Sequence, residues 1–340
     1  MATATQPVSD AEWQALYTAA KDYFDEKPWE WMDDDQLFGV YDKDTDTVGY
    51  CCIMGALGEV LGLAVYMGAD GYVGYRAMQH SSQDWAALDD THGQLHALVA
   101  AFDNREDVRK GDRAIMTRLG LRFRGRQAWP TFRYHRPGKI PSLPSAPQVR
   151  HLTRALAESL VVAKVFQNHP DDLVRPDRQI LVRRPAGDGS SEWTSQWEAS
   201  PVQVYVPPSI SVPAQSLAEA RNLGTMKASW EVDTFYLNGL GDPETGDVPR
   251  AYLLVDHESE LVLDMQVTSD TDSIPHMWHS MLQKMMDFGG CPEQILVRQQ
   301  RVAAELSPLA NALGIPLTQF PVLPVISAAR RSVSEYLRHR

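Results

Sequence analysis

The first apolar pattern in the chain has the period of an α-helix. It begins behind Ser9 and Glu12, which have the spacing of a capping box, and it ends before Pro28. Residues three or four apart lie on one side of a helix, so we predict an amphipathic helix that buries this face. The apolar members of the face are Trp13, Leu16, Tyr17, Ala20 and Phe24.

Short apolar runs bounded by turn residues follow this helix and predict strands. Residues 36–41 and 48–54 flank a turn at 43–46, which is typical of a β-hairpin, and residues 62–67 predict a third strand. The run at 95–102 fits either a strand or a buried helix segment, because periodicity does not separate the two in so short a segment.

The next part of the chain mixes helical and extended patterns. Residues 72–78 and 113–119 predict helices, 126–134 predict an extended segment, and Ser145 caps a long helix that reaches about residue 168. Helices and strands that do not alternate regularly indicate an α+β domain, which we place at residues 9–169.

Residues 170–229 are rich in proline and predict a linker. One hairpin is expected inside it, at residues 179–197 around the turn at 187–189. The domain boundary is therefore expected in this linker, and a second domain over residues 230–340.

The second domain has a more regular pattern. An initial hairpin followed by alternating helices and strands predicts an α/β domain with a mixed sheet. The expected elements are strands at 251–255 and 261–267, a helix at 276–288, a strand at 294–297, a helix at 302–313, a strand at 316–320 and a helix at 328–337.

Length and composition agree with two folded domains, and the charge is unevenly distributed. The chain has 340 residues, of which 44% are apolar and 22% charged, and this is not the composition of a disordered chain. The net charge of −12 hides an acidic start, with four Lys and Arg against eighteen acids in residues 1–103. Residues 104–154 carry thirteen Lys and Arg against three acids, and we call these residues the basic segment. This segment is the strongest functional signal in the sequence.

The basic segment has two interpretations. Its guanidinium groups are interleaved with rings such as Trp129 and Phe132, which suits phosphate contacts and base stacking in nucleic acid, or another anionic partner. The same charges can instead neutralise the acidic first hundred residues, and charge alone does not separate these cases. The candidates for an anion site are Arg118, Arg122, Arg124, Arg126, Arg133, Arg136 and Lys139.

Several short motifs are similar to those of uncharacterised bacterial domain families. Residues 230–337 resemble one such family, and motifs in the first half resemble another. These resemblances imply a bacterial cytosolic protein with two domains, and they supply no catalytic residues. The motifs of the first half are Pro28-Trp-Glu-Trp-Met32, Leu37-Phe-Gly39, Gly49-Tyr-Cys51, Ile53-Met-Gly55, Gly58-Glu59, Tyr66-Met-Gly68, Trp129-Pro-x-Phe132 and Arg136-Pro-Gly138.

The element order of the second domain also resembles a degenerate ribonuclease-H-like fold. Nucleases of that fold hold two metal ions with clustered carboxylates, and Asp256 at the end of the 251–255 strand matches the first position. Arg298 stands where a second carboxylate is needed, and the pattern lacks the third strand of the usual meander. A metal-dependent nuclease that uses Asp256 with Asp264 or Asp287 is therefore an alternative hypothesis.

Other metal or cofactor chemistry has little support in the sequence. His276, His279 and Asp272 lack a fourth zinc ligand, and the acidic turn at 42–46 lacks the glycine and the glutamate of a calcium loop. The chain has neither a nucleotide-binding glycine loop nor a serine-nucleophile elbow. We therefore expect no cofactor.

The longest apolar run and the cysteines bear on the compartment. Glu59 interrupts the run at residues 51–68, so we expect buried strands there and no membrane partner. Cys51, Cys52 and Cys291 form no disulfide framework, which favours a cytoplasmic protein.

The favoured interpretation is a non-catalytic, two-domain binding protein with an anion or nucleic-acid surface on residues 118–139. A further alternative is a protein-interaction adaptor, in which aromatic surfaces at Trp29-Glu-Trp31 and Phe132-Arg-Tyr134 contact a partner chain. Exposed aromatic side chains would support the adaptor, and buried ones would remove its basis.

Overall fold

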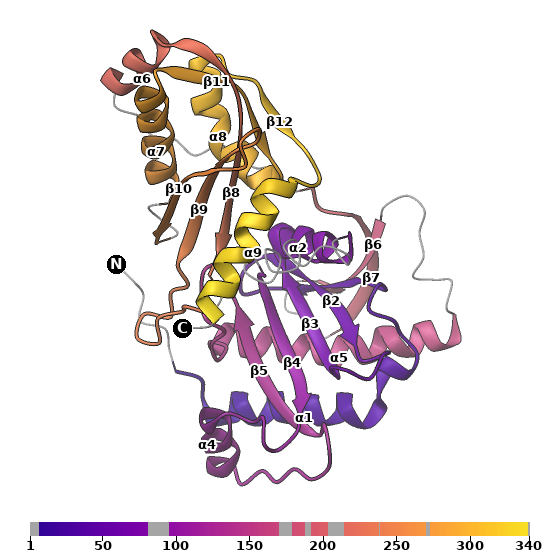
Figure 1. The fold of residues 1–340 in the computed structure, drawn as a ribbon. Helices are drawn as coiled ribbons and strands as arrows, with labels where there is room; N and C mark the ends of the chain where they lie inside the picture. Colours follow the sequence, from indigo (N-terminus) through magenta and orange to yellow (C-terminus); the bar gives the residue numbers. More distant parts are fainter. Residues whose placement is uncertain are drawn as a thin grey trace. The chain divides into compact units, whose positions relative to one another are not determined.

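The computed structural model describes residues 7–80, 95–169, 179–187, 192–202, 214–237, 239–269 and 273–338, which form two units (Figure 1). The first unit holds the described residues up to 202 except 138–140, and the second unit holds the others. Each unit has its own sheet and its own buried core. The expected two-domain layout of helices and mixed sheets is therefore confirmed.

The first unit is built on a seven-stranded sheet. The strand order is β5-β4-β3-β2-β1-β6-β7, in which β6 pairs parallel with β1 and all other neighbours are antiparallel. Its elements are α1 (Asp10–Glu26), the short 3₁₀ helix η1 (Pro28–Glu30), β1 (Phe38–Asp42), β2 (Thr47–Met54), β3 (Gly62–Met67), α2 (Gly68–His80), β4 (Ala97–Asp103), α4 (Lys110–Arg118), β5 (Trp129–His135), α5 (Ala146–Asn168), β6 (Gln179–Pro185) and β7 (Trp193–Ala199).

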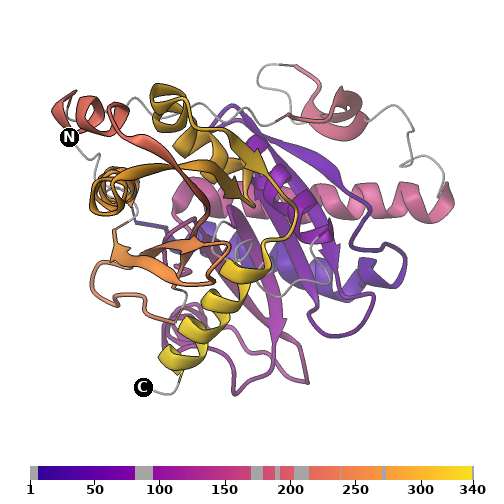
Figure 2. The same cartoon turned by 45° about the horizontal axis from the view of Figure 1, so that its top comes forward.

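The hairpin expected at 179–197 is β6 and β7, and it extends the sheet of the first unit instead of lying in a linker. Val182 of β6 lies opposite Gly39 of β1. A parallel neighbour requires a long crossover, which α5 provides by carrying the chain from β5 across the strands (Figure 2). The first unit therefore extends beyond residue 169, to 202 among the described residues.

Both faces of this sheet are buried. Helices α1 and α5 pack together on one face, where their apolar residues join Ile53 and Val65 in the larger core. Helix α2 covers the other face, where Tyr75 packs against Tyr66 with ring centroids 5.0 Å apart. Cys51 and Cys52 are adjacent in β2, so they fall into different cores and both are free thiols. Of the described helices, none is long and apolar enough to cross a membrane.

The second unit is built on a five-stranded sheet with the order β10-β9-β8-β11-β12. Strands β8, β9 and β10 form an antiparallel meander, whereas β11 pairs parallel with β8 and with β12. The elements are α6 (Ala214–Arg221), β8 (Gly224–Tyr236), β9 (Arg250–Asp256), β10 (Val262–Thr268), α7 (Ser273–Phe288), β11 (Gly290–Val297), α8 (Gln300–Leu313), β12 (Leu317–Gln319) and α9 (Pro324–Arg338).

The sequence pattern missed β8, which is the central strand of the second sheet. The interpretation that began the meander at 251–255 was therefore wrong by one strand, and no strand of the meander is missing. Helices α7 and α8 cover one face, with Met281 and Leu306 in the core, and α9 covers the other through Ile326, together with Leu323 directly before the helix.

Candidate functional site

The basic segment folds into α4, β5, the loop between them and the first turns of α5. Gly120, with φ of 67°, ends α4, because its N–H donates to the carbonyl of Thr117 and the next N–H, from Leu121, donates to that of Met116. This is the hydrogen-bond pattern of a Schellman motif, which needs a left-handed residue. The chain therefore turns sharply before Arg122.

This loop forms one side of a cavity of about 450 Å³, which we call the arginine pocket. The guanidinium carbon of Arg105 lies 6.0 Å from the ring centroid of Trp129, and Phe123 packs against the same indole at 6.0 Å. Four arginines and two aromatic rings thus surround one cavity. They are Arg105, Arg113, Arg122, Arg124, Phe123 and Trp129.

The four arginines differ in how firmly they are held. Nη2 of Arg113 donates to the carbonyl oxygen of Arg105 at 2.8 Å, which fixes its side chain across the start of α4. Arg122 and Arg124 are exposed, and neither forms an ion pair with a residue that the structure describes. Their charges are therefore available to an anion in the pocket.

Three of the seven predicted anion-binding residues are engaged in ion pairs. Nε of Arg118 lies 2.8 Å from Oδ1 of Asp10, and Lys139 pairs with Asp247. Arg133 forms a two-pronged pair with the buried Asp112, at 2.8 and 2.5 Å, and these hydrogen bonds raise the pKa of Arg133. Only Arg118 pairs with the acidic first hundred residues; Asp112 belongs to the basic segment itself and Asp247 to the second unit.

The other four predicted residues are exposed. Arg122 and Arg124 line the arginine pocket, Arg126 follows in the same loop, and Arg136 lies 5.8 Å from the ring centroid of Tyr134. Sequence reasoning missed Arg105 and Arg113 as members of the pocket. The approach of Arg105 depends on the pairing of β4 with β5, where Asp103 lies opposite Trp129.

The three carboxylates of the nuclease hypothesis have separate local partners. Asp256 accepts hydrogen bonds from the backbone N–H and the hydroxyl of Ser259, at 2.8 and 2.6 Å, as a turn residue does. Asp264 accepts from Gln266 at 2.8 Å and also from the hydroxyl of Ser280 on α7, and Asp287 accepts from Gln283 at 2.9 Å.

No group of three His, Cys, Asp or Glu side chains able to hold a metal occurs in the described part of the chain. His276 and His279 are exposed on α7, and Asp272 lies outside the described residues.

The centre of β8 carries a buried carboxylate that is surrounded by cations. Oδ2 of Asp233 lies 2.7 Å from Nη1 of Arg330 and 3.3 Å from Nη2 of Arg298, and Oδ1 accepts from Gln299 at 2.9 Å. Asp233 has no exposed surface. This position is therefore a structural ion cluster.

The aromatic surfaces of the adaptor hypothesis are mostly interior. Trp29 packs against Tyr23 and Phe102, and Phe132 packs against Tyr17 with ring centroids 5.0 Å apart. Trp29 and Phe132 are buried, so the adaptor loses its basis.

Comparison with known proteins found two families of unknown function. A domain of unknown function, DUF7309, matches residues 13–183, and another, DUF6930, matches residues 216–334. No curated protein matches the chain. The expected resemblance to two uncharacterised domain families is confirmed.

Proposed function

The chain belongs to the DUF7309 family of unknown function, and we propose that its first unit binds single-stranded nucleic acid at the arginine pocket. The observation that carries the proposal is the convergence of four guanidinium groups and two aromatic rings on one cavity. Arginine forks match phosphate oxygens, and rings stack on unpaired bases.

The distribution of ion pairs supports this surface as the binding face. Arg122 and Arg124 are exposed without a carboxylate partner among the described residues, whereas Arg118 and Arg133 are neutralised by Asp10 and Asp112. The net charge of −12 opposes approach from a distance, so binding depends on short-range contacts at the pocket.

A double variant, Arg122→Gln with Arg124→Gln, tests the proposal. We expect it to bind a labelled 15-nucleotide oligodeoxythymidylate more weakly than the unchanged protein in fluorescence anisotropy. Removing two phosphate contacts should also reduce the slope of log K against log salt by roughly 1.4, at about 0.7 per contact for single strands.

A matched control is Lys21→Gln with Lys164→Gln, which removes two charges paired with Asp25 and Glu26 elsewhere in the first unit. Equal loss of binding in both double variants would mean that net charge alone explains the effect, and it would overturn the proposal that the arginine pocket is the binding site. Unfolding of the arginine variant, seen by circular dichroism, would mean that the two side chains support the fold, which contradicts the proposal.

The second unit is proposed to have a ribonuclease-H-like fold without metal-dependent cleavage. Its strand order, with β11 parallel to both β8 and β12, supports the fold. The residues do not fit a pair of metal ions, because Arg298 and Arg330 bind the central Asp233. When Mg²⁺ is added to the oligonucleotide-binding assay, we therefore expect no cleavage of the oligonucleotide. Cleavage that Asp256→Asn abolishes would instead support the nuclease hypothesis.

The cytoplasmic placement stays a prediction. Cys51, Cys52 and Cys291 are buried free thiols, and burial raises the pKa of each. This state supports a reducing compartment.

A further inference from the structure

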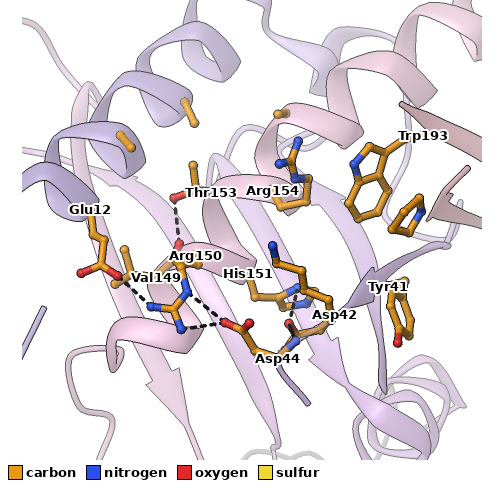
Figure 3. Close-up of a pocket in the computed structure, with 15 residues that line it drawn as sticks. Glu12, Tyr41, Asp42, Asp44, Val149, Arg150, His151, Thr153, Arg154 and Trp193 are labelled. Atoms are coloured by element: carbon orange, nitrogen blue, oxygen red, sulfur yellow. Dashed lines mark hydrogen bonds and ion pairs between the residues drawn. The ribbon is translucent and has the colours of Figure 1, made fainter. Parts of the chain in front are cut away.

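A second cavity of the first unit, of about 380 Å³, is lined by four separate parts of the chain (Figure 3). They are α1, the end of β1 with its turn, α5, and the hairpin of β6 and β7. We call it the Trp193 pocket. Its volume lies within the range of small-molecule sites.

The apolar part of the lining suits a flat ring. Ala15 and Ala19 of α1 and Ala157 of α5 have short side chains, and Pro185 and Trp193 complete the apolar surface. The indole of Trp193 is only partly buried; the guanidinium of Arg154 lies over part of its ring, and the rest of the ring surface remains for stacking.

Most charges in this pocket are already satisfied. The guanidinium of Arg150 lies 2.7 Å from Oε1 of Glu12 and 2.7 Å from Oδ2 of Asp44. Hydrogen bonds from Ser9, and then from Arg150, lower the pKa of Glu12 to about 2. Arg150 is therefore not the group that would receive an anion.

Two lining cations remain, the exposed Lys43 of the turn after β1 and Arg154. The guanidinium carbon of Arg154 lies 5.1 Å from the ring centroid of Trp193, and the nearest carboxylate oxygen among the described residues, on Glu158, is 3.9 Å away. Glu158 instead accepts from Arg183 at 2.9 Å. Arg154 thus faces the pocket beside the indole without an acceptor for its N–H groups in the described chain.

The inner wall carries a buried histidine without hydrogen bonds. Neither ring nitrogen of His151 has a hydrogen-bond partner in the part of the chain that the structure describes, and the residue is 3% exposed. Its Nδ1 is 3.8 Å from Oδ1 of Asp42, beyond hydrogen-bond length. Buried polar groups that lack partners are uncommon. Nε2 lies against Gly49 of β2, so a polar group of a ligand at this wall would meet Nδ1, on the side of Asp42.

We propose that the Trp193 pocket binds a small planar aromatic carboxylate. The carboxylate accepts from the fork of Arg154, and the ring lies between Trp193 and the alanine surface. A monoanion fits better than a dianion because the carboxylates of Glu12, Asp42 and Asp44 line the same cavity. This inference is independent of nucleic-acid binding at the arginine pocket.

Titration calorimetry of the whole chain with 2-naphthoate tests the proposal. Arg154→Gln should weaken binding at least about tenfold, the usual effect of losing a charged two-pronged hydrogen bond. The uncharged 2-naphthamide should bind the unchanged protein weakly for the same reason. Lys164→Gln is the matched control on α5, because it removes an exposed charge that pairs with Glu26 outside the pocket, and it should leave the affinity unchanged.

Four results would overturn the proposal. They are no binding of millimolar 2-naphthoate by the unchanged protein, equal binding by Arg154→Gln, tighter binding of 2-naphthyl phosphate than of 2-naphthoate, and loss of binding only in the Arg122→Gln, Arg124→Gln variant. The last result would place the ligand in the arginine pocket. Loss of oligonucleotide binding with retained naphthoate binding would instead affect only the proposed function.

Discussion

Nδ1 of His151 lies 3.8 Å from Oδ1 of Asp42, and both side chains are buried. Asp42 is not left without partners, because its oxygens accept from the N–H of Asp44 at 3.1 Å and from the hydroxyl of Thr45 at 2.7 Å. Burial lowers the pKa of His151, and the nearby Asp42 and Asp44 oppose this only in part. The histidine is therefore held neutral in the folded first unit.

We expect the first unit to lose stability as the pH falls below about 6.5, the ordinary pKa of histidine. The unfolded chain binds a proton there that the folded chain resists. Hydrogen exchange of α5 peptides between pH 7.5 and 5.5 should report this loss, and His151→Leu should reduce it. The control is His169→Gln, which replaces an exposed histidine at the C-terminal cap of the same helix and should leave the pH dependence of stability unchanged. An unchanged pH dependence in His151→Leu would contradict the assignment of this effect to His151.

Gly49→Ala should destabilise the first unit by about 1–3 kcal/mol, the usual cost of overpacking a core. An added Cβ would lie 2.4 Å from Nε2 of His151 and 2.5 Å from a methyl carbon of Val65. Urea unfolding measures the change. Gly74→Ala is the control, because no atom lies within 4 Å of its added Cβ; equal stability of the two variants would refute the close approach.

Asp112→Asn should cost about 3–5 kcal/mol in the free energy of unfolding, because it leaves the guanidinium of Arg133 with an uncompensated, mostly buried charge. The same urea experiment detects it. Asp112→Leu with Arg133→Met removes both charges and should recover much of the loss. A double variant as unstable as Asp112→Asn would mean that shape, and not charge, controls this position.

The second unit should respond to pH in the opposite direction. Nδ1 of His257 lies 2.6 Å from Oε1 of the fully buried Glu231, and this hydrogen bond raises the pKa of His257. The stabilisation is complete below about pH 6.5 and is lost as the pH rises through the raised pKa. Exchange of β8 peptides should show His257→Gln to be more damaging at pH 5.5 than at pH 9. His279→Gln, exposed on α7, is the control, and equal damage at both pH values would contradict the pair.

The helices were the part of the fold that sequence reasoning predicted best. The α1 capping box is present, with Glu12 accepting from the Ser9 N–H at 2.9 Å, and α5 begins at Ala146, directly after the predicted cap Ser145. Strand β8 was missed because Glu231 and Asp233 interrupt its apolar pattern. Both carboxylates are buried with partners that lie far away in the sequence, such as Arg330.

For a related reason, the sequence predicted Arg122 and Arg124 of the arginine pocket but not Arg105 and Arg113. Charge density marked Arg122 and Arg124 together with Arg118 and Arg133, although the latter two are neutralised. Asp10 lies 108 positions before Arg118, and no local spacing rule joins such a pair. The Trp193 pocket was not predicted at all, because four distant segments form its walls.

The parallel addition of β6 to β1 has a consequence for how the first unit is assembled and dissected. During synthesis the sheet cannot be completed until the chain has passed residue 199, long after the antiparallel strands have emerged from the ribosome. A recombinant fragment cut at the family boundary, residue 183, would end inside β6 and lack both β7 and Trp193. Such a fragment would keep the arginine pocket and lose a wall of the Trp193 pocket, so only a fragment that extends to about residue 202 preserves both pockets.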